Sequence, residues 1–172
     1  MNQVGEPEKT GMVDRLSYFV DRLARFLITV MMAAMVLIIL FGVFNRFLFK
    51  LPVSWTEEVA KYLLIWVSML GSAVAIRIGA HVGVGLLVTR LGEKKRNLIS
   101  WINQVLIMIF IISLVLLGMK LCVREIDQMG YATRISMFYP FLAIPAGCLM
   151  IIVQLLYLMK MLYKKQSPPL GY

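Results

Sequence analysis

The sequence predicts an all-α integral membrane protein with four transmembrane helices. Hydrophobic residues make up 60% of the chain and charged residues 16%, and the mean hydropathy of +0.82 lies far above that of soluble proteins. A membrane span needs about 20 largely apolar residues. We therefore expect a single four-helix membrane domain over residues 1–172, with spans at about 26–46, 55–79, 98–120 and 137–160.

The distribution of basic residues predicts the orientation of these spans. Of the 18 Lys and Arg residues, 12 fall in the N-terminal segment, the second loop and the C-terminal tail, and 6 in the first and third loops. Because positive loops stay in the cytoplasm, both termini are expected to be cytoplasmic. The net charge of +9 is thereby explained by topology, and no nucleic-acid partner is expected.

The segment before the first span is amphipathic. Apolar residues recur at helical spacing from Met12 to Leu27, and Asp14, Arg15 and Asp21 lie on the opposite side. Two interpretations remain open. The segment is a lead-in along the cytoplasmic membrane surface, or it extends the first helix beyond the bilayer with one face in water.

Charged residues flank the hairpin between the first two spans. Arg46 closes the first span, and Glu57 and Glu58 open the second at the same depth. We expect a partly buried ion pair between Arg46 and Glu58, or failing that Glu57; the alternative is that Arg46 extends to the lipid headgroups. The spacing of Ser54 and Glu57 also predicts a capping box at the start of the second helix.

The second span carries a row of small residues, which we call the small-residue row. It consists of Ser68, Gly71, Ser72 and Ala75, at spacings of three and four. Small side chains at this spacing let helix backbones approach closely in lipid. The row therefore predicts a close helix–helix contact, either within this chain or with a partner.

The chain between residues 55 and 88 is too long for one upright helix, since each residue adds about 1.5 Å. We expect a break near residues 79–83 and an interfacial helix before the third span. His81 lies beside this break and is the only histidine. It is interpreted as a helix-end hydrogen-bonding residue, with a proton relay as the alternative; haem ligation would need a pair of ligands. No cofactor and no metal site are expected.

The third loop is polar and charged, and on the predicted topology it faces the periplasm. Arg124, Asp127 and Arg134 are its candidate contacts with a soluble partner. The fourth span follows, with Pro140 in its first turns and Pro145 expected to kink it nearby.

Short motifs follow one another along most of the chain. They are Arg46-Phe47, Trp55-Thr56-Glu57-Glu58, Trp66, Leu70-Gly71-Ser72-Ala73, Arg77, Ala80-His81-Val82 and Ile144-Pro145-Ala146-Gly147. With these motifs the chain resembles the small membrane subunit (DctQ-type) of tripartite ATP-independent periplasmic (TRAP) transporters. The resemblance implies a multi-pass protein of the bacterial inner membrane and a role in Na⁺-coupled uptake of an organic acid, of the sialic acid or C4-dicarboxylate class.

The resemblance also implies the partners. A soluble periplasmic protein captures the substrate, and a large membrane subunit carries the substrate and ion sites. The small subunit is a non-catalytic scaffold beside the large one, in contact with membrane lipid. On this basis Trp66 and the small-residue row are candidate subunit contacts, and Arg77 and His81 form a signature at the cytoplasmic end.

Two other classes of membrane protein are alternatives. An independent four-helix carrier, such as a small multidrug exporter, would need a carboxylate inside its first span, and residues 26–44 contain none. A membrane anchor for electron transfer would need more histidines to bind haem. The motifs favour the transporter subunit over both.

Overall fold

The computed structural model describes residues 11–51, 53–78 and 93–163. Four long helices lie within these residues: α1 (Met12–Leu48), α2 (Ser54–Arg77), α4 (Glu93–Arg124) and α6 (Ala143–Tyr163), the last preceded by the short α5 (Phe138–Phe141). Four segments are long and apolar enough to cross a membrane, α5 and α6 together forming the fourth. The all-α, four-span prediction is confirmed, whereas the predicted orientation in the membrane stays a prediction.

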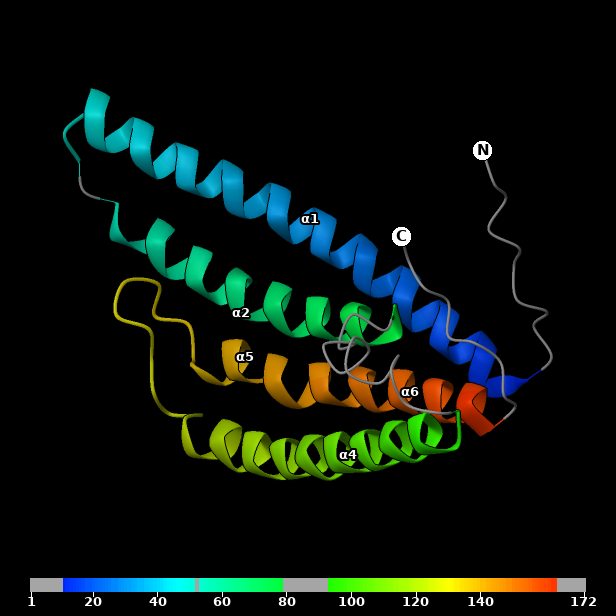
Figure 1. The fold of residues 1–172 in the computed structure, drawn as a ribbon. Helices are drawn as coiled ribbons and strands as arrows, with labels where there is room; N and C mark the ends of the chain where they lie inside the picture. Colours follow the sequence, from blue (N-terminus) through cyan, green and yellow to red (C-terminus); the bar gives the residue numbers. More distant parts are fainter. Residues whose placement is uncertain (1–10, 52, 79–92, 164–172) are drawn as a thin grey trace, which may run out of the picture.

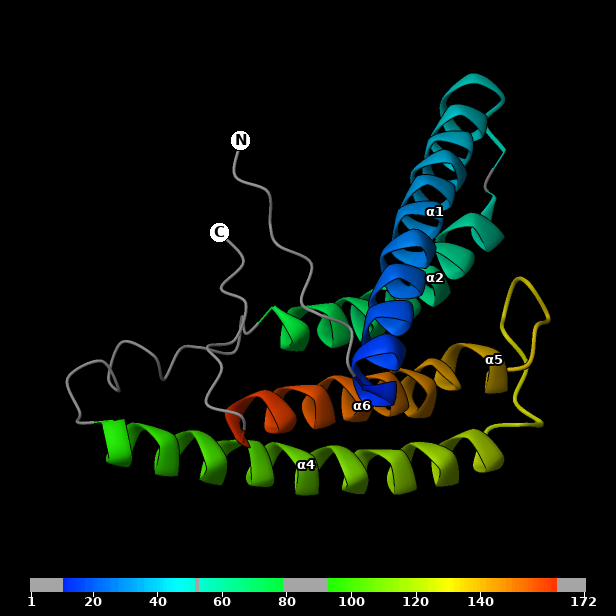
Figure 2. The ribbon, with the colours of Figure 1, turned by 90° about the vertical axis from the view of Figure 1, so that its right-hand side faces the viewer.

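Helix α6 is the shared element of the bundle. It lies between α4 on one side and α2 on the other, and α1 runs along the far side of α2 towards the C-terminal part of α6 (Figure 1). Turned by 90°, α4 and α6 run side by side while α1 rises steeply from them (Figure 2). Because α6 contacts all three other helices, it is the most buried of the four spans.

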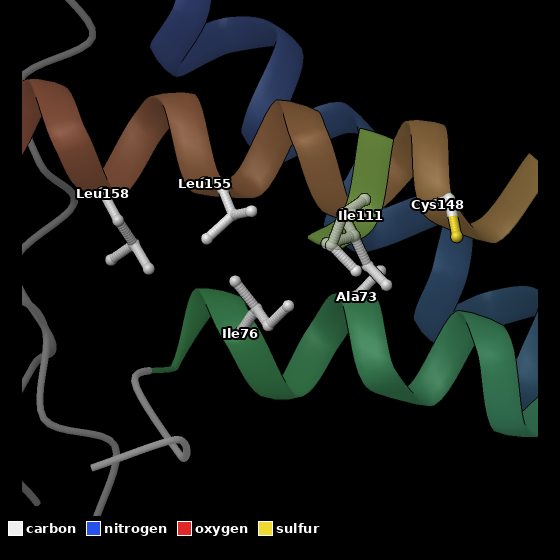
Figure 3. Close-up of a cluster of buried hydrophobic side chains, with 7 residues drawn as sticks. Ala73, Ile76, Ile111, Cys148, Leu155 and Leu158 are labelled. Carbon is white, nitrogen blue, oxygen red and sulfur yellow. The ribbon is translucent and has the colours of Figure 1, made fainter. Parts of the chain in front are cut away.

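The apolar core is formed by α2, α4 and α6. Its buried side chains come from successive turns of α6 and from the facing sides of the other two helices (Figure 3). They are Ala73, Ile76, Ile111, Cys148, Ile151, Leu155 and Leu158. Cys148 and the second cysteine, Cys122, are both free and buried, as expected for thiols in packed surroundings.

Helix α1 is continuous over 37 residues, about 55 Å at a rise of 1.5 Å per residue. The amphipathic segment and the first span are therefore one helix. Its first half packs through Ser17, Val20 and Ala24, whereas Met12 and Phe19 of the apolar side are exposed. The apolar stripe that the sequence indicated is therefore divided: Val20 packs inside the bundle, whereas Met12 and Phe19 point outward, where an apolar side chain can pack against lipid.

The ends of α2 differ from their predictions in one respect. Val53 is the N-cap residue and no side chain caps the helix, so the predicted capping box is wrong. Ser54 is already helical and therefore does not occupy the cap position. Helix α2 ends at Arg77 with Ile78 as C-cap. The predicted break at 79–83, the interfacial helix and His81 lie outside the described residues.

The fourth span is interrupted near its start. Leu142 separates α5 from α6, and Pro145 lies in the first turn of α6. A proline at 145 has no N–H to donate to the Phe141 carbonyl one turn earlier. The interruption therefore precedes Pro145 by one turn and does not coincide with it.

Candidate functional site

Polar contacts are concentrated at the two ends of the bundle. One end carries Met12 and Tyr163, and we call it the terminal end. The other carries the turn between α1 and α2 together with residues 125–137, which we call the outer loop (Figure 1). The predicted site residues divide between these two ends.

Arg77 lies at the centre of the terminal end. Its Nη1 donates a hydrogen bond to the Ser17 carbonyl oxygen (2.9 Å) and lies 3.3 Å from Oδ2 of Asp21. Its guanidinium carbon is 5.5 Å from the ring centroid of Tyr18 and 5.6 Å from that of Tyr157, within cation–π distance. With its side chain only 13% exposed, Arg77 joins α1, α2 and α6 largely out of water.

Two further contacts tie α1 to α6 beside Arg77. The Ser17 hydroxyl donates to Oε1 of Gln154 (2.5 Å), and Nε2 of Gln154 donates back to the Ser17 carbonyl oxygen (3.1 Å). Both residues are fully buried. Lys160 and Asp14 form an ion pair at 2.5 Å. We call these residues the Arg77 cluster: Asp14, Ser17, Asp21, Arg77, Gln154 and Lys160.

The Arg77 cluster stabilises one arrangement of three helices. Asp21 shares its Oδ2 between Arg77 and Arg25, the latter at 2.9 Å. Removing one member of a mostly buried ion pair leaves an uncompensated charge and costs several kcal/mol, on the order of 3. The cluster therefore has a structural role: it fixes where α1 crosses α2 and α6.

Sequence reasoning singled out Arg77 but missed its partners. Asp14, Ser17 and Asp21 are spaced three and four apart and share one face of α1. That face was assigned to water because of its charges. The partners of Arg77 could have been predicted from a general rule: polar residues in membrane helices usually face other helices, where they form hydrogen bonds and ion pairs.

At the other end, Glu58 holds the outer loop. Its Oε1 accepts a hydrogen bond from the Tyr62 hydroxyl, one turn further along α2. Its Oε2 accepts the backbone N–H groups of Ala132 (2.7 Å) and Thr133 (2.9 Å). The carboxylate is thus satisfied by three donors, none of them a positive charge, and we call these interactions the Glu58–loop contact.

The structure does not bring Arg46 into an ion pair with Glu58 or Glu57 among the residues described. The Glu58 carboxylate is already occupied by the loop between α4 and α5. Arg46 and Glu57 instead line one cavity between α1 and α2, without contacting each other as a pair.

The small-residue row is open to the outside of the chain. Ser68 and Ser72 are exposed, Ala75 and Trp66 are partly exposed, and a Cβ added at Gly71 would meet no atom within 4 Å. The buried face of α2 lies on the other side and includes Leu70, Ala73 and Ile76. Within this chain the row therefore makes no close helix contact at Gly71.

The outer loop has a defined backbone. Gly130 N–H donates to the Ile135 carbonyl oxygen and Met137 N–H to that of Gln128, both at 2.8 Å, which forms a short antiparallel bridge. The bridge turns Tyr131 into solvent, where it is 93% exposed.

The three charged residues predicted to contact a partner, Arg124, Asp127 and Arg134, are all exposed. The outer loop thus presents an aromatic ring among charges of both signs. Within the described residues no group of three His, Cys, Asp or Glu side chains could hold a metal ion.

The chain is similar to proteins of one transporter family. Residues 35–164 match the sequence model described as the DctQ component of tripartite ATP-independent periplasmic transporters. The C4-dicarboxylate TRAP transporter small permease protein DctQ of Vibrio cholerae is 29% identical over 84 residues, 49% of this chain and 36% of the relative. The sialic acid TRAP transporter small permease protein SiaQ of the same organism is 24% identical over 103 residues, 60% of each chain.

A third relative is a much longer polypeptide. The sialic acid TRAP transporter permease protein SiaT of Haemophilus influenzae is 29% identical over 102 residues, which are 59% of this chain but 17% of SiaT. In each case the chain covers less than two thirds of the relative's length.

Proposed function

Because the chain belongs to the DctQ family of TRAP transporters, multi-pass proteins of the inner membrane, we propose that it is a non-catalytic scaffold subunit of an organic-acid importer. The main support is where its charges lie. No Asp, Glu, Lys or Arg occurs in residues 26–45, 62–76, 97–119 or 135–159. A coupled carrier of an anion needs polar groups near the bilayer midplane to replace lost hydration.

The charged and buried polar groups at the bundle ends are largely occupied in holding this chain together. The Arg77 cluster joins α1, α2 and α6, and the Glu58–loop contact joins α2 to the outer loop. These contacts suit a rigid support. We propose that a large membrane subunit carries the substrate, of the sialic acid or C4-dicarboxylate class, together with Na⁺ coupling.

We propose that the small-residue row and Trp66 face the large subunit. Gly71 has open space around it, so another helix can approach its backbone closely there. The match to a segment of SiaT supports a partnership with a larger permease, since in that protein a similar segment is part of one long chain. Gly71→Leu should reduce co-purification of the large subunit, and Val74→Leu should not.

We propose that the outer loop contacts a periplasmic substrate-binding protein. Arg124, Asp127 and Arg134 supply exposed charges, and Tyr131 supplies an exposed aromatic ring of the kind that anchors interfaces. The Glu58–loop contact presents these side chains in one geometry, which lowers the entropy lost on binding.

Reconstitution into liposomes tests the proposal. Three preparations are compared: this subunit, the large subunit, and both together. Each receives the periplasmic protein, a Na⁺ gradient, and radiolabelled sialic acid or C4-dicarboxylate. We expect uptake only with both subunits. Uptake by this chain alone would contradict a scaffold role, and full uptake by the large subunit alone would show that this chain is not required.

A further inference from the structure

A cavity of about 320 Å³ lies between the loop-side ends of α1 and α2. On α1 its walls are Ile39, Gly42, Val43 and Arg46, spaced three and four apart and so on one helix face. On α2 they are Val53, Ser54, Thr56 and Glu57. The cavity thus joins an apolar part to two opposite charges.

Two of the lining residues, Gly42 and Thr56, lie at a close approach of the two helices. A Cβ added at Gly42 would lie 2.5 Å from Oγ1 of Thr56, so the glycine lets α2 pack directly against α1. The Thr56 hydroxyl donates to the Val53 carbonyl oxygen (2.7 Å), so its one hydrogen is already used within the chain. Phe41 of α1 and Trp55 of α2 also contact each other, with ring centroids 6.0 Å apart.

The two charged side chains of the cavity are available to a ligand. Arg46 and Glu57 are both exposed, and neither has a hydrogen bond or ion pair with any other residue that the structure describes. A site that offers a guanidinium and a carboxylate side by side, beyond ion-pair distance, complements a ligand carrying a phosphate and an ammonium group.

We propose that this cavity binds the headgroup of a zwitterionic phospholipid with a primary ammonium, of the phosphatidylethanolamine type. Arg46 binds the phosphate, and Glu57 accepts hydrogen bonds from the ammonium. The volume is at the small end for ligand pockets, about 300–1,000 Å³, which suits a headgroup without its acyl chains.

The surface next to the cavity suits the acyl chains. Exposed apolar side chains continue along the same face of α1 towards the middle of the helix, at spacings of three and four. They are Val43, Ile39, Val36 and Met32. A lipid whose headgroup occupies the cavity would therefore lay its acyl chains along α1 in the direction expected within a bilayer.

The ammonium requirement distinguishes this lipid from others. Phosphatidylglycerol has the phosphate but no positive group for Glu57. Phosphatidylcholine has a quaternary ammonium, which cannot donate a hydrogen bond. We therefore expect the site to prefer phosphatidylethanolamine over both, through Glu57, while Arg46 contributes to the binding of all three.

Native mass spectrometry of the purified full-length chain with each of the three lipids tests this proposal. Wild-type protein should retain one phosphatidylethanolamine in preference to the other two lipids. Arg46→Gln should weaken its binding roughly tenfold, the factor expected for losing a hydrogen bond to a charged group. Glu57→Gln should remove the preference over phosphatidylcholine. Lys50→Gln, an exposed basic residue outside the cavity, is the matched control and should change binding less than twofold.

A second pair of variants keeps the test decisive if a charge substitution impairs folding. Val43→Trp fills the cavity without altering a charge and should abolish retention, whereas Phe44→Trp, on the neighbouring exposed position, should not. Equal retention of the three lipids by the wild type, an effect of Lys50→Gln as large as that of Arg46→Gln, or undiminished binding by Val43→Trp would overturn the proposal. So would crosslinking from position 46 to a protein partner instead of lipid.

Discussion

Arg77 combines three kinds of contact in one side chain: a hydrogen bond to a backbone carbonyl, an ion pair with Asp21, and two aromatic rings within cation–π distance. A guanidinium is suited to this because it is planar, permanently charged and weakly hydrated. A lysine at this position would present a compact charge with a stronger hydration shell.

The first prediction concerns this arginine. Arg77→Met should destabilise the subunit by about 3 kcal/mol, because Asp21 would keep only the half-exposed Arg25 as a partner and the Ser17 carbonyl oxygen would lose its charged donor. Thermal unfolding in detergent measures the change. Arg22→Met is the control. Arg22 follows Asp21 in α1, is exposed, and makes no ion pair with any residue that the structure describes. Equal effects of the two substitutions would contradict a specific role for Arg77.

The second prediction concerns Glu58. Glu58→Ala should raise the hydrogen-exchange rates of the Ala132 and Thr133 amides roughly tenfold, since each loses a charged acceptor. Amides in the middle of α6 should be unaffected. Glu57→Ala, at the neighbouring position, should leave the outer loop unchanged. A uniform increase over the whole chain would indicate general destabilisation and not a local contact.

At the scale of the helices, glycines lie on the two sides of α2 in opposite surroundings, one in α6 and one in α2 itself. On its buried side α2 packs against α6, where a Cβ added at Gly147 would lie 2.7 Å from Cβ of Met69. On its outward side Gly71 has open space. Gly147 thus lets α2 pack closely against α6 within the chain, whereas Gly71 leaves room for a helix from outside it.

The third prediction compares these two glycines. Gly147→Val should lower the stability of the isolated subunit by roughly 2 kcal/mol, the usual cost of overpacking a core, because Met69 cannot move its Cβ without moving its backbone. Gly71→Val should change it by less than about 0.5 kcal/mol, as is usual at open positions. Unfolding midpoints in the same detergent provide the comparison. Similar losses at both positions would show that Gly71 is packed within the chain.

The helices also show what could be predicted from the sequence. The number of spans followed from hydropathy, because the bilayer imposes a length of about 20 apolar residues. The packing face of α1 did not follow, since helical spacing identifies two faces without saying which one meets protein. Likewise, Arg46 and Glu58 were expected to pair from their closeness in the hairpin. The loop that binds the Glu58 carboxylate is distant in the sequence, since Ala132 lies 74 residues after Glu58.

At the scale of the whole molecule, the asymmetry of basic residues predicts the orientation in the membrane. The fourth prediction is that Lys50 and Asp127 face the periplasm and Arg15 the cytoplasm. Single cysteines at these exposed positions, in a chain whose two native cysteines are replaced, can be labelled in intact cells with an impermeant reagent. Labelling should occur at positions 50 and 127. Labelling at position 15 without cell lysis would reverse the topology.

Helices α1 and α2 are joined near both ends of α2, by the Gly42–Thr56 approach and by the Asp21–Arg77 ion pair. The two attachment points are separated by the same number of residues on each helix, so the pair is matched in length between them. A bilayer that thins or thickens usually changes the tilt of single helices. Here α1 cannot tilt without α2, because the two helices are attached at both points. A change in membrane thickness should therefore tilt the pair together as one rigid unit.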